Sequence, residues 1–135
     1  MLVETQAGYR NLSRLLTQMK LRAPKGEGAL VLEELEGYTA GLVALTGRPA
    51  LMGNRYGVGG VLDRLLGLFG RTQVYIELQR HHLRDEEHDN HALLTMASAY
   101  HVPVVATNGV RFATISDRPL YDVLTCIREH CTIDK

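Results

Sequence analysis

The sequence lacks the features that mark membrane and secreted proteins. No apolar run approaches the roughly 20 residues that a membrane-spanning helix needs, so we expect no membrane anchor. The N-terminal stretch carries an acidic residue, Glu4, where the apolar part of a signal peptide would run. We therefore expect a cytoplasmic protein.

Two further absences concern charge and cysteine. The 15 basic residues are balanced by 15 acidic ones, whereas a free-standing DNA-binding module usually carries a basic excess that neutralises phosphates. Only two cysteines, Cys126 and Cys131, are present. A disulfide between them is not expected in the cytosol. Without CxxC spacing, they do not predict a zinc site either.

Familiar catalytic motifs are also missing. Gly57, Gly59 and Gly60 superficially resemble a phosphate-binding loop, but no Lys-Ser/Thr pair follows them. The residue order shows no Ser-His-Asp or Cys-His nucleophile pattern. His88 and His91 lie one helical turn apart among acidic residues, a pattern that favours a solvated helix face over a metal site.

What remains is an ordinary globular composition, with 45% apolar and 22% charged residues in a chain of 135, which is the size of one domain. Short apolar runs at 42–46, 74–78 and 103–107 predict strands. Helical periodicity separates and flanks them. This alternation predicts an α/β fold with parallel strands, joined by crossover helices that cover the sheet. The final helix should bury its apolar stripe: Leu120, Val123, Leu124 and Ile127.

Polar residues follow two of these strands, at 79–82 and 107–111, where α/β proteins often place their chemistry. His81 could bind a metal or act as an acid or base there. The alternative is that His81 is an exposed polar residue in a loop. Its position in the sequence alone favours this alternative.

Glu77 is a carboxylate inside an apolar strand, between Ile76 and Leu78. Strand alternation places it on one face with Tyr75 and Gln79, a face that would line the lumen of a closed barrel. It could serve as a ligand or base, or form an ion pair with an arginine such as Arg80 or Arg111. We favour the structural role.

Five ordered blocks resemble a known family: ETQAGYRNLSRLLT, RAPKGEG, VYIELQRH, VPVVATNGVRFAT and RPLYDVLTCIREH. They are similar to the bacterial DNA polymerase III alpha subunits, and most of all to the error-prone branch induced by DNA damage. The resemblance assigns residues 1–135 to the later part of the polymerase-and-histidinol-phosphatase (PHP) domain. It therefore implies a partial (β/α) barrel of PHP type, cut from a larger polymerase chain.

The resemblance also implies a metal centre that has decayed. His81 matches the family histidine that ends the ELQ-x-H strand. The later family motif, Asn-Asp-x-His-Tyr, reads here with Asn108, Gly109 and Arg111 in its first, second and fourth positions. An arginine has no lone pair for a metal, and its charge repels one. Zinc or manganese could bind in the full-length domain, whose other ligands lie upstream in the family.

These observations predict a structural segment of an error-prone polymerase that acts in synthesis past DNA lesions, meeting DNA through the remainder of the polymerase chain. One alternative is half of a metal-dependent phosphoesterase or 3′-exonuclease site, and another is a stand-alone interaction domain. The polymerase residues of the family lie far downstream of this segment, so this chain alone should not polymerise DNA. Unpaired edges of a partial barrel also predict self-association into a homo-oligomer.

Overall fold

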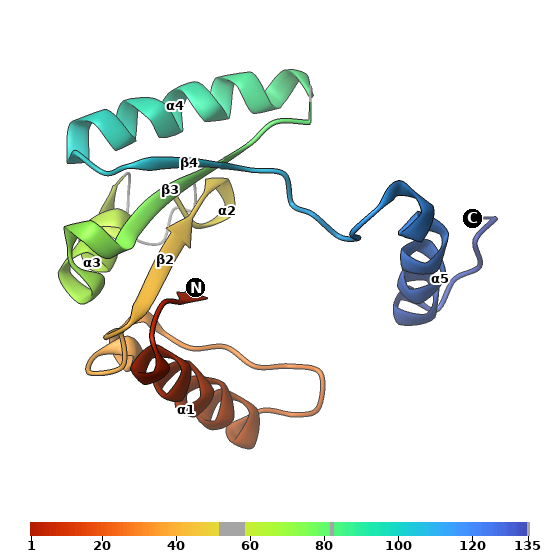
Figure 1. The fold of residues 1–135 in the computed structure, drawn as a ribbon, viewed down its shortest axis with the longest axis horizontal. Coiled ribbons are helices and arrows are strands. Elements are labelled where there is room, and N and C mark those ends of the chain that lie inside the picture. Colours follow the sequence, from red (N-terminus) through yellow and green to blue (C-terminus); the bar gives the residue numbers. More distant parts are fainter. Residues whose placement is uncertain (52–58, 82, 135) are drawn as a thin grey trace.

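The computed structural model describes residues 1–51, 59–81 and 83–134 and shows an α/β fold built on a curled four-stranded sheet (Figure 1). His82 and Gly57 lie outside the described residues. The strands are β1 (Leu2–Val3), β2 (Leu42–Thr46), β3 (Val74–Gln79) and β4 (Val104–Thr107). The α-helices are α1 (Gln6–Arg22), α2 (Arg48–Leu51), α3 (Gly60–Phe69), α4 (Arg84–Tyr100) and α5 (Arg118–Glu129).

The sheet is mixed, so the prediction of uniformly parallel strands is wrong. β2, β3 and β4 are parallel neighbours, but β1 pairs antiparallel to β2. The reason is the connection through α1. It leaves β1 and returns to β2 at the same end of the sheet, where Glu4 N–H donates to Gly41 O over 2.9 Å. Strands joined at one end run in opposite directions, as in a long hairpin.

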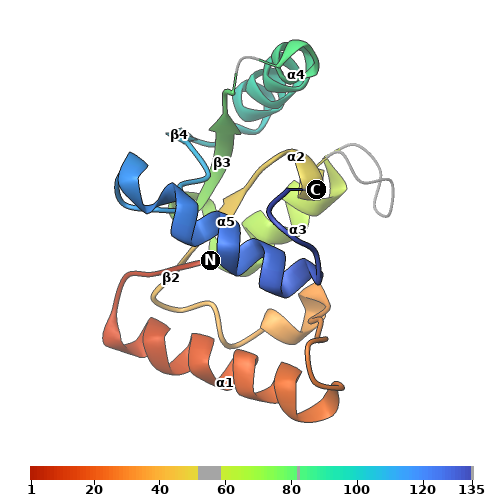
Figure 2. The ribbon, with the colours of Figure 1, turned by 90° about the vertical axis from the view of Figure 1, so that its right-hand side faces the viewer.

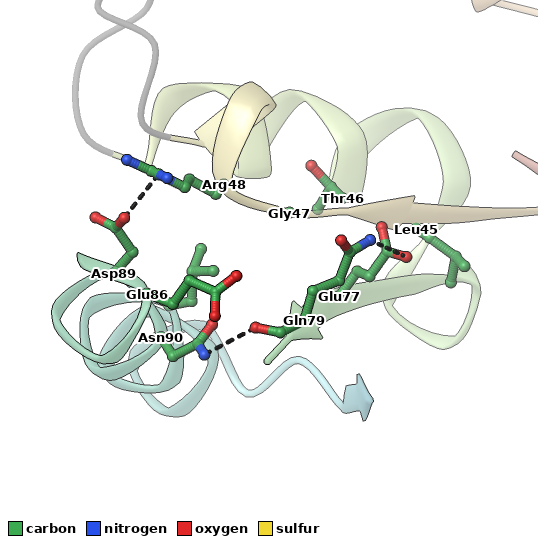
Figure 3. Close-up of a pocket in the computed structure, with 10 residues that line it drawn as sticks. Leu45, Thr46, Gly47, Arg48, Glu77, Gln79, Glu86, Asp89 and Asn90 are labelled. Carbon is green, nitrogen blue, oxygen red and sulfur yellow. Dashed lines mark hydrogen bonds and ion pairs between the residues drawn. The ribbon is translucent and has the colours of Figure 1, made fainter. Parts of the chain in front are cut away.

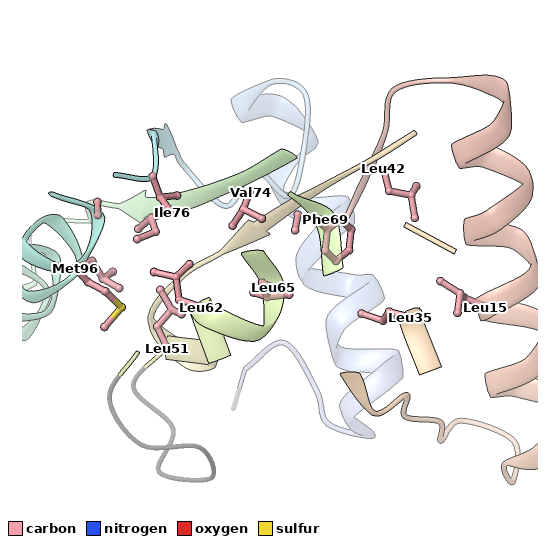
Figure 4. Close-up of a cluster of buried hydrophobic side chains, with 14 residues drawn as sticks. Leu15, Leu35, Leu42, Leu51, Leu62, Leu65, Phe69, Val74, Ile76 and Met96 are labelled. Carbon is pink, nitrogen blue, oxygen red and sulfur yellow. The ribbon is translucent and has the colours of Figure 1, made fainter. Parts of the chain in front are cut away.

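The apolar core lies between one face of the sheet and the helices α3 and α4, and it extends through Leu35 to Leu15 of α1 (Figure 4). Val74 and Ile76 point into it from β3 and are fully buried. The helical stripes predicted from periodicity are confirmed at the buried positions of α3 and α4: Leu62, Leu65, Phe69, Leu93, Met96 and Ala97. The opposite sheet face carries half-buried residues, so strand alternation is confirmed for Tyr75, Glu77 and Gln79.

The N-terminal end of α1 packs on the β1–β2 pair through backbone atoms, whereas Leu15 further along the helix is buried in the core. Thr5 caps α1 by accepting a hydrogen bond from Gly8 N–H over 3.2 Å. Gly8 itself is buried against Gly41, and a Cβ added at Gly8 would overlap the carbonyl oxygen of Gly41. Gly41 also has a φ of 74°, in the left-handed region that glycine adopts without strain. This contact fixes how close α1 sits to the β1–β2 pair.

The last helix stands apart from the sheet and its covering helices in Figure 1, and Figure 2 views the molecule from the side of this helix. The prediction that its apolar stripe faces inward is wrong: Leu120, Val123, Leu124 and Ile127 are 45–66% exposed. Its ring contact is local, between Tyr121 and Phe112, with centroids 6.0 Å apart. The periodicity identified the apolar face correctly, but a helix pattern carries no information about what covers that face.

Candidate functional site at the strand ends

A pocket of about 420 Å³ opens at the carboxyl ends of β2 and β3, against the first turns of α4 (Figure 3). Residues 45–48 form one wall. Glu77 and Gln79 contribute from β3, and α4 supplies the rest of the lining: Glu86, Asp89, Asn90 and Leu93. Strand ends of parallel sheets are where α/β proteins commonly bind ligands, and the sequence predicted candidate residues at this edge.

Glu77 is held by neutral donors. Its Oε1 atom accepts a hydrogen bond from Thr107 Oγ1 over 2.6 Å and another from Gln79 Nε2 over 3.3 Å. Gln79 and Thr107 are direct partners across β3 and β4, so register brings these groups together. Within the described chain no ion pair joins Glu77 to Arg80 or Arg111. Arg80 Nη2 instead contacts Glu87 Oε1 at 2.5 Å.

Two contacts tie α4 to the strand ends. Asn90 Nδ2 donates to the backbone carbonyl of Gln79 over 3.0 Å. Arg48 Nε lies 2.6 Å from Asp89 Oδ2, and the Asp89 side chain is only 18% exposed. This ion pair links α2 to α4 across the pocket mouth. Both contacts therefore fix the walls of the pocket.

His81 lies at the end of β3 and is bound to the start of α4. Its Nδ1 atom is 2.7 Å from Glu86 Oε1, and its backbone N–H donates to Glu86 Oε2 over 2.6 Å. Leu83 N–H donates to the same oxygen over 3.2 Å. Glu86 thus accepts hydrogen bonds from the backbone N–H groups that precede the helix. Its negative charge also interacts favourably with the positive end of the helix dipole.

The same contact shifts both titrating groups. The Glu86 carboxylate raises the pKa of His81, and the backbone carbonyl of Asn108 adds to this effect. Reciprocally, the hydrogen bond from His81 lowers the pKa of Glu86. A raised pKa favours imidazolium, which has no lone pair for a metal. A metal at His81 would therefore compete with a proton for the imidazole nitrogen.

The former metal-motif positions follow β4. Asn108 places its carbonyl beside His81. Gly109 has a φ of 56°, and its Cα hydrogen faces the side-chain amide of Gln79. Arg111 is exposed on the segment that leads to α5. Two of the three therefore lie beside His81 and the pocket residues.

These residues do not make a complete metal centre. Across the described ranges, no three His, Cys, Asp or Glu side chains are arranged to hold a metal ion. His88 and His91 are exposed on α4, as the solvated-face interpretation expects. His101 ends that helix in a left-handed conformation with φ 54°. We therefore derive no chemistry through a metal in this chain.

Sequence reasoning missed several residues of the site. Glu86 carries a recognisable signal, because an acidic residue in the first turn often caps a helix. Arg48, Asp89 and Thr107 carry none. Each is an ordinary polar residue whose partner lies about 30 or 40 positions away, and contacts at that range depend on the tertiary fold.

Comparison with known proteins completes the description. No protein-family model matches the chain. Among curated proteins, it is 36% identical to an error-prone DNA polymerase of Rhodopseudomonas palustris over 130 residues, covering 96% of this chain. The error-prone DNA polymerase of Pseudomonas syringae pv. syringae is 36% identical over 98% of this chain. That of Ralstonia pickettii is 34% identical over 95% of this chain.

The chain spans only 12–13% of the length of these relatives. Within its described residues, no helix is both long and apolar enough to cross a bilayer. The match covers nearly every residue here, and the relatives named carry the identity that the five sequence blocks predicted. This chain is therefore a homologue of one segment of the error-prone DNA polymerases.

Proposed function

We propose that this chain works as part of the PHP domain of a bacterial error-prone DNA polymerase, and that its role there is structural. The near-complete match to polymerases about eight times longer carries the proposal. The parent polymerase copies damaged DNA in the cytoplasm and contacts DNA through its other parts. The segment itself supports the polymerase core, and its own metal centre is degenerate.

The exposed surfaces support a structural role. The apolar face of α5, defined as Leu120, Val123, Leu124 and Ile127, is 45–66% exposed. Such a face is unfavourable in water and is normally covered by a partner surface. β1 and β4 are the outer strands of the described sheet, and outer strands invite further pairing. In our proposal the remainder of the polymerase covers both, and a second copy covers them when that remainder is missing.

The partnered state of the pocket supports the same role. Glu77 and Glu86 are each hydrogen-bonded to another side chain, and Asp89 lies within ion-pair distance of Arg48. Carboxylates held in this way join neighbouring strands or join strand ends to helices. They would need to exchange those partners before they could serve as ligands or bases.

A charge on the α5 face tests the proposal. Leu124→Asp should lower the melting temperature of the full-length polymerase and the yield of folded enzyme, while polymerase activity per folded molecule stays unchanged. Arg118→Asp introduces the same side chain on the polar side of α5. It removes the exposed ion pair with Asp122, which contributes only on the order of a few tenths of a kcal/mol, so both values should stay near wild type. Equal melting temperatures for the two variants would contradict the proposal, because the face would then be uncovered in the whole protein.

A second candidate function is a metal-dependent phosphoesterase or 3′-exonuclease. It is favoured by the position of His81 at a strand end, with Nδ1 held 2.7 Å from a carboxylate oxygen. Carboxylates often orient metal-binding histidines in this way. Upstream residues of the longer protein would supply the other ligands. Metal analysis of the full-length protein separates the two: near-stoichiometric metal that falls in His81→Ala favours the enzyme, and metal-free protein favours the structural role.

A further inference from the structure

The end of α5 brings two thiols together. His130 follows the helix with φ 54° and ψ 41°, and Cys131 N–H donates to the carbonyl of Cys126 over 3.0 Å. This is the hydrogen bond of a Schellman helix end, in which the side chains of the two bonded residues frequently touch. That contact is usually between apolar groups. Here both members are cysteines.

This helix end places the Cys126 and Cys131 side chains next to each other. Burial raises the pKa of the Cys126 thiol, and the hydrogen bond with the Cys131 side chain raises it further. The charge of Asp122 acts in the same direction. Both cysteines are reduced; Cys126 is half-buried and Cys131 is exposed. An oxidant in solution therefore reaches Cys131 first, with a second thiol beside it.

We propose that Cys126 and Cys131 form a reversible disulfide on exposure to hydrogen peroxide, and that this bond locks the C-terminal end of α5. The Cys131 thiolate attacks one peroxide oxygen, an S–O bond forms, the O–O bond breaks, and the departing hydroxide is protonated to water. The Cys126 sulfur then attacks the Cys131 sulfur. The S–S bond forms, the S–O bond breaks, and the second hydroxide leaves as water with the Cys126 proton.

The balance is two thiols and one peroxide giving one disulfide and two waters. In a reducing cytosol the pair stays as thiols, which agrees with the sequence expectation of no resting disulfide. Oxidation adds a covalent side-chain link beside the backbone hydrogen bond at the last turn of α5. Ile127, a member of the apolar face, lies in that turn, so the link fixes the end of the face. This inference does not depend on the proposed function.

Peptide mapping tests the bond directly. Trypsin cleaves after Arg128, so Cys126 falls in residues 112–128 and Cys131 in residues 129–135. The full-length protein is treated with hydrogen peroxide, blocked with iodoacetamide and digested without reductant. We expect these two peptides to be recovered joined, from a monomeric protein about 2 Da lighter than the reduced form. Dithiothreitol should restore both free peptides.

Two variants assign the order of events. In Cys126→Ser, Cys131 should accumulate as a sulfenic acid that dimedone traps. In Cys131→Ser, Cys126 should remain mostly unmodified at the same peroxide dose. Wild-type protein with Cys131 oxidised to the sulfinic acid and no joined peptides would overturn the proposal. So would joined peptides found only in covalent dimers, since the bond would then link two molecules.

Discussion

The imidazole of His81 and the carboxylate of Glu86 lie 2.7 Å apart, Nδ1 to Oε1, and join the end of β3 to the beginning of α4. Glu86 Oε2 binds two backbone N–H groups at the same junction. One acidic side chain thus caps the helix and holds the histidine. The contact therefore makes the turn between β3 and α4 sensitive to pH.

The first prediction concerns this pair. Glu86→Gln should lower the pKa of His81, because the neutral amide removes the main cause of its increase. Titration of the His81 ring protons by NMR measures the change, and Glu87→Gln, on the adjacent exposed residue, is the matched control. An unchanged His81 pKa in Glu86→Gln would show that the two side chains are apart in solution.

The contact between His81 and Glu86 should also stabilise the fold most within a limited range of pH. Folding raises the pKa of His81 above its ordinary 6.5, so this contribution is lost as the pH rises through the folded-state value. Folding lowers the pKa of Glu86 below its ordinary 4.5, so that contribution is lost as the pH falls through the folded-state value. Between pH 4.5 and pH 6.5, the ordinary pKa values of the two groups, both contributions to stability are present. Melting temperatures across pH should show a wild-type gain over Glu86→Gln that is greatest there.

The second prediction tests the bond between β3 and β4. Thr107→Val removes the hydroxyl that donates to Glu77 over 2.6 Å and should cost about 1 kcal/mol or more of unfolding free energy. Thr95→Val is the matched control, because the Thr95 hydroxyl donates only to the carbonyl of His91 in its own helix. Urea denaturation measures both. Equal losses would mean that Glu77 is adequately solvated without Thr107.

The third prediction tests the core with two neighbouring leucines of α4. Leu93 is 1% exposed and Leu94 is 48% exposed. Leu93→Ala should destabilise the fold by about 2–5 kcal/mol through lost burial and a cavity, whereas Leu94→Ala should cost much less. If urea denaturation reversed this order, α4 would be rotated about its axis relative to the structure described here.

The fourth prediction concerns the former metal motif. Arg111→His restores one ligand type, but the described residues offer no group of three ligands for it to join. The variant should therefore bind little zinc or manganese and gain little or no phosphoesterase activity. Elemental analysis and a chromogenic phosphoester assay check both points, with Arg111→Gln as a control that removes only the charge. Near-stoichiometric metal in Arg111→His alone would contradict a degenerate centre.

The spacing of apolar residues predicted the buried faces of the helices that cover the sheet. The stripes of α3 and α4 were predictable, because leucines at helical spacing must face an apolar layer and a sheet was available. The same reasoning failed for Leu124 on α5, since periodicity cannot say whether a layer is present. The antiparallel direction of β1 was equally hidden, because two residues carry no signal of orientation.

The candidate site was predictable only in part, for a related reason. His81 and Glu77 could be identified as polar residues at or within strands. Their partners could not, since Thr107 meets Glu77 across 30 positions and only strand register brings them together. The ion-pair hypothesis for Glu77 named arginines because a carboxylate in a strand is expected to pair with a positive charge. The half-buried carboxylate instead uses a hydroxyl and an amide, donors that are small enough to sit beside it on the sheet.

The backbone contact between Gly8 and Gly41 has a genetic consequence. Every missense change in a glycine codon adds a Cβ, and at either position that atom would strike the opposing segment. At Gly8 the struck atoms are the Gly41 backbone, and at Gly41 they are the capping hydroxyl of Thr5 and the Gly8 backbone, so α1 would have to separate from the β1–β2 pair. These two codons should therefore tolerate only synonymous change. Random mutagenesis of the gene, followed by selection for function, should recover both glycines unaltered.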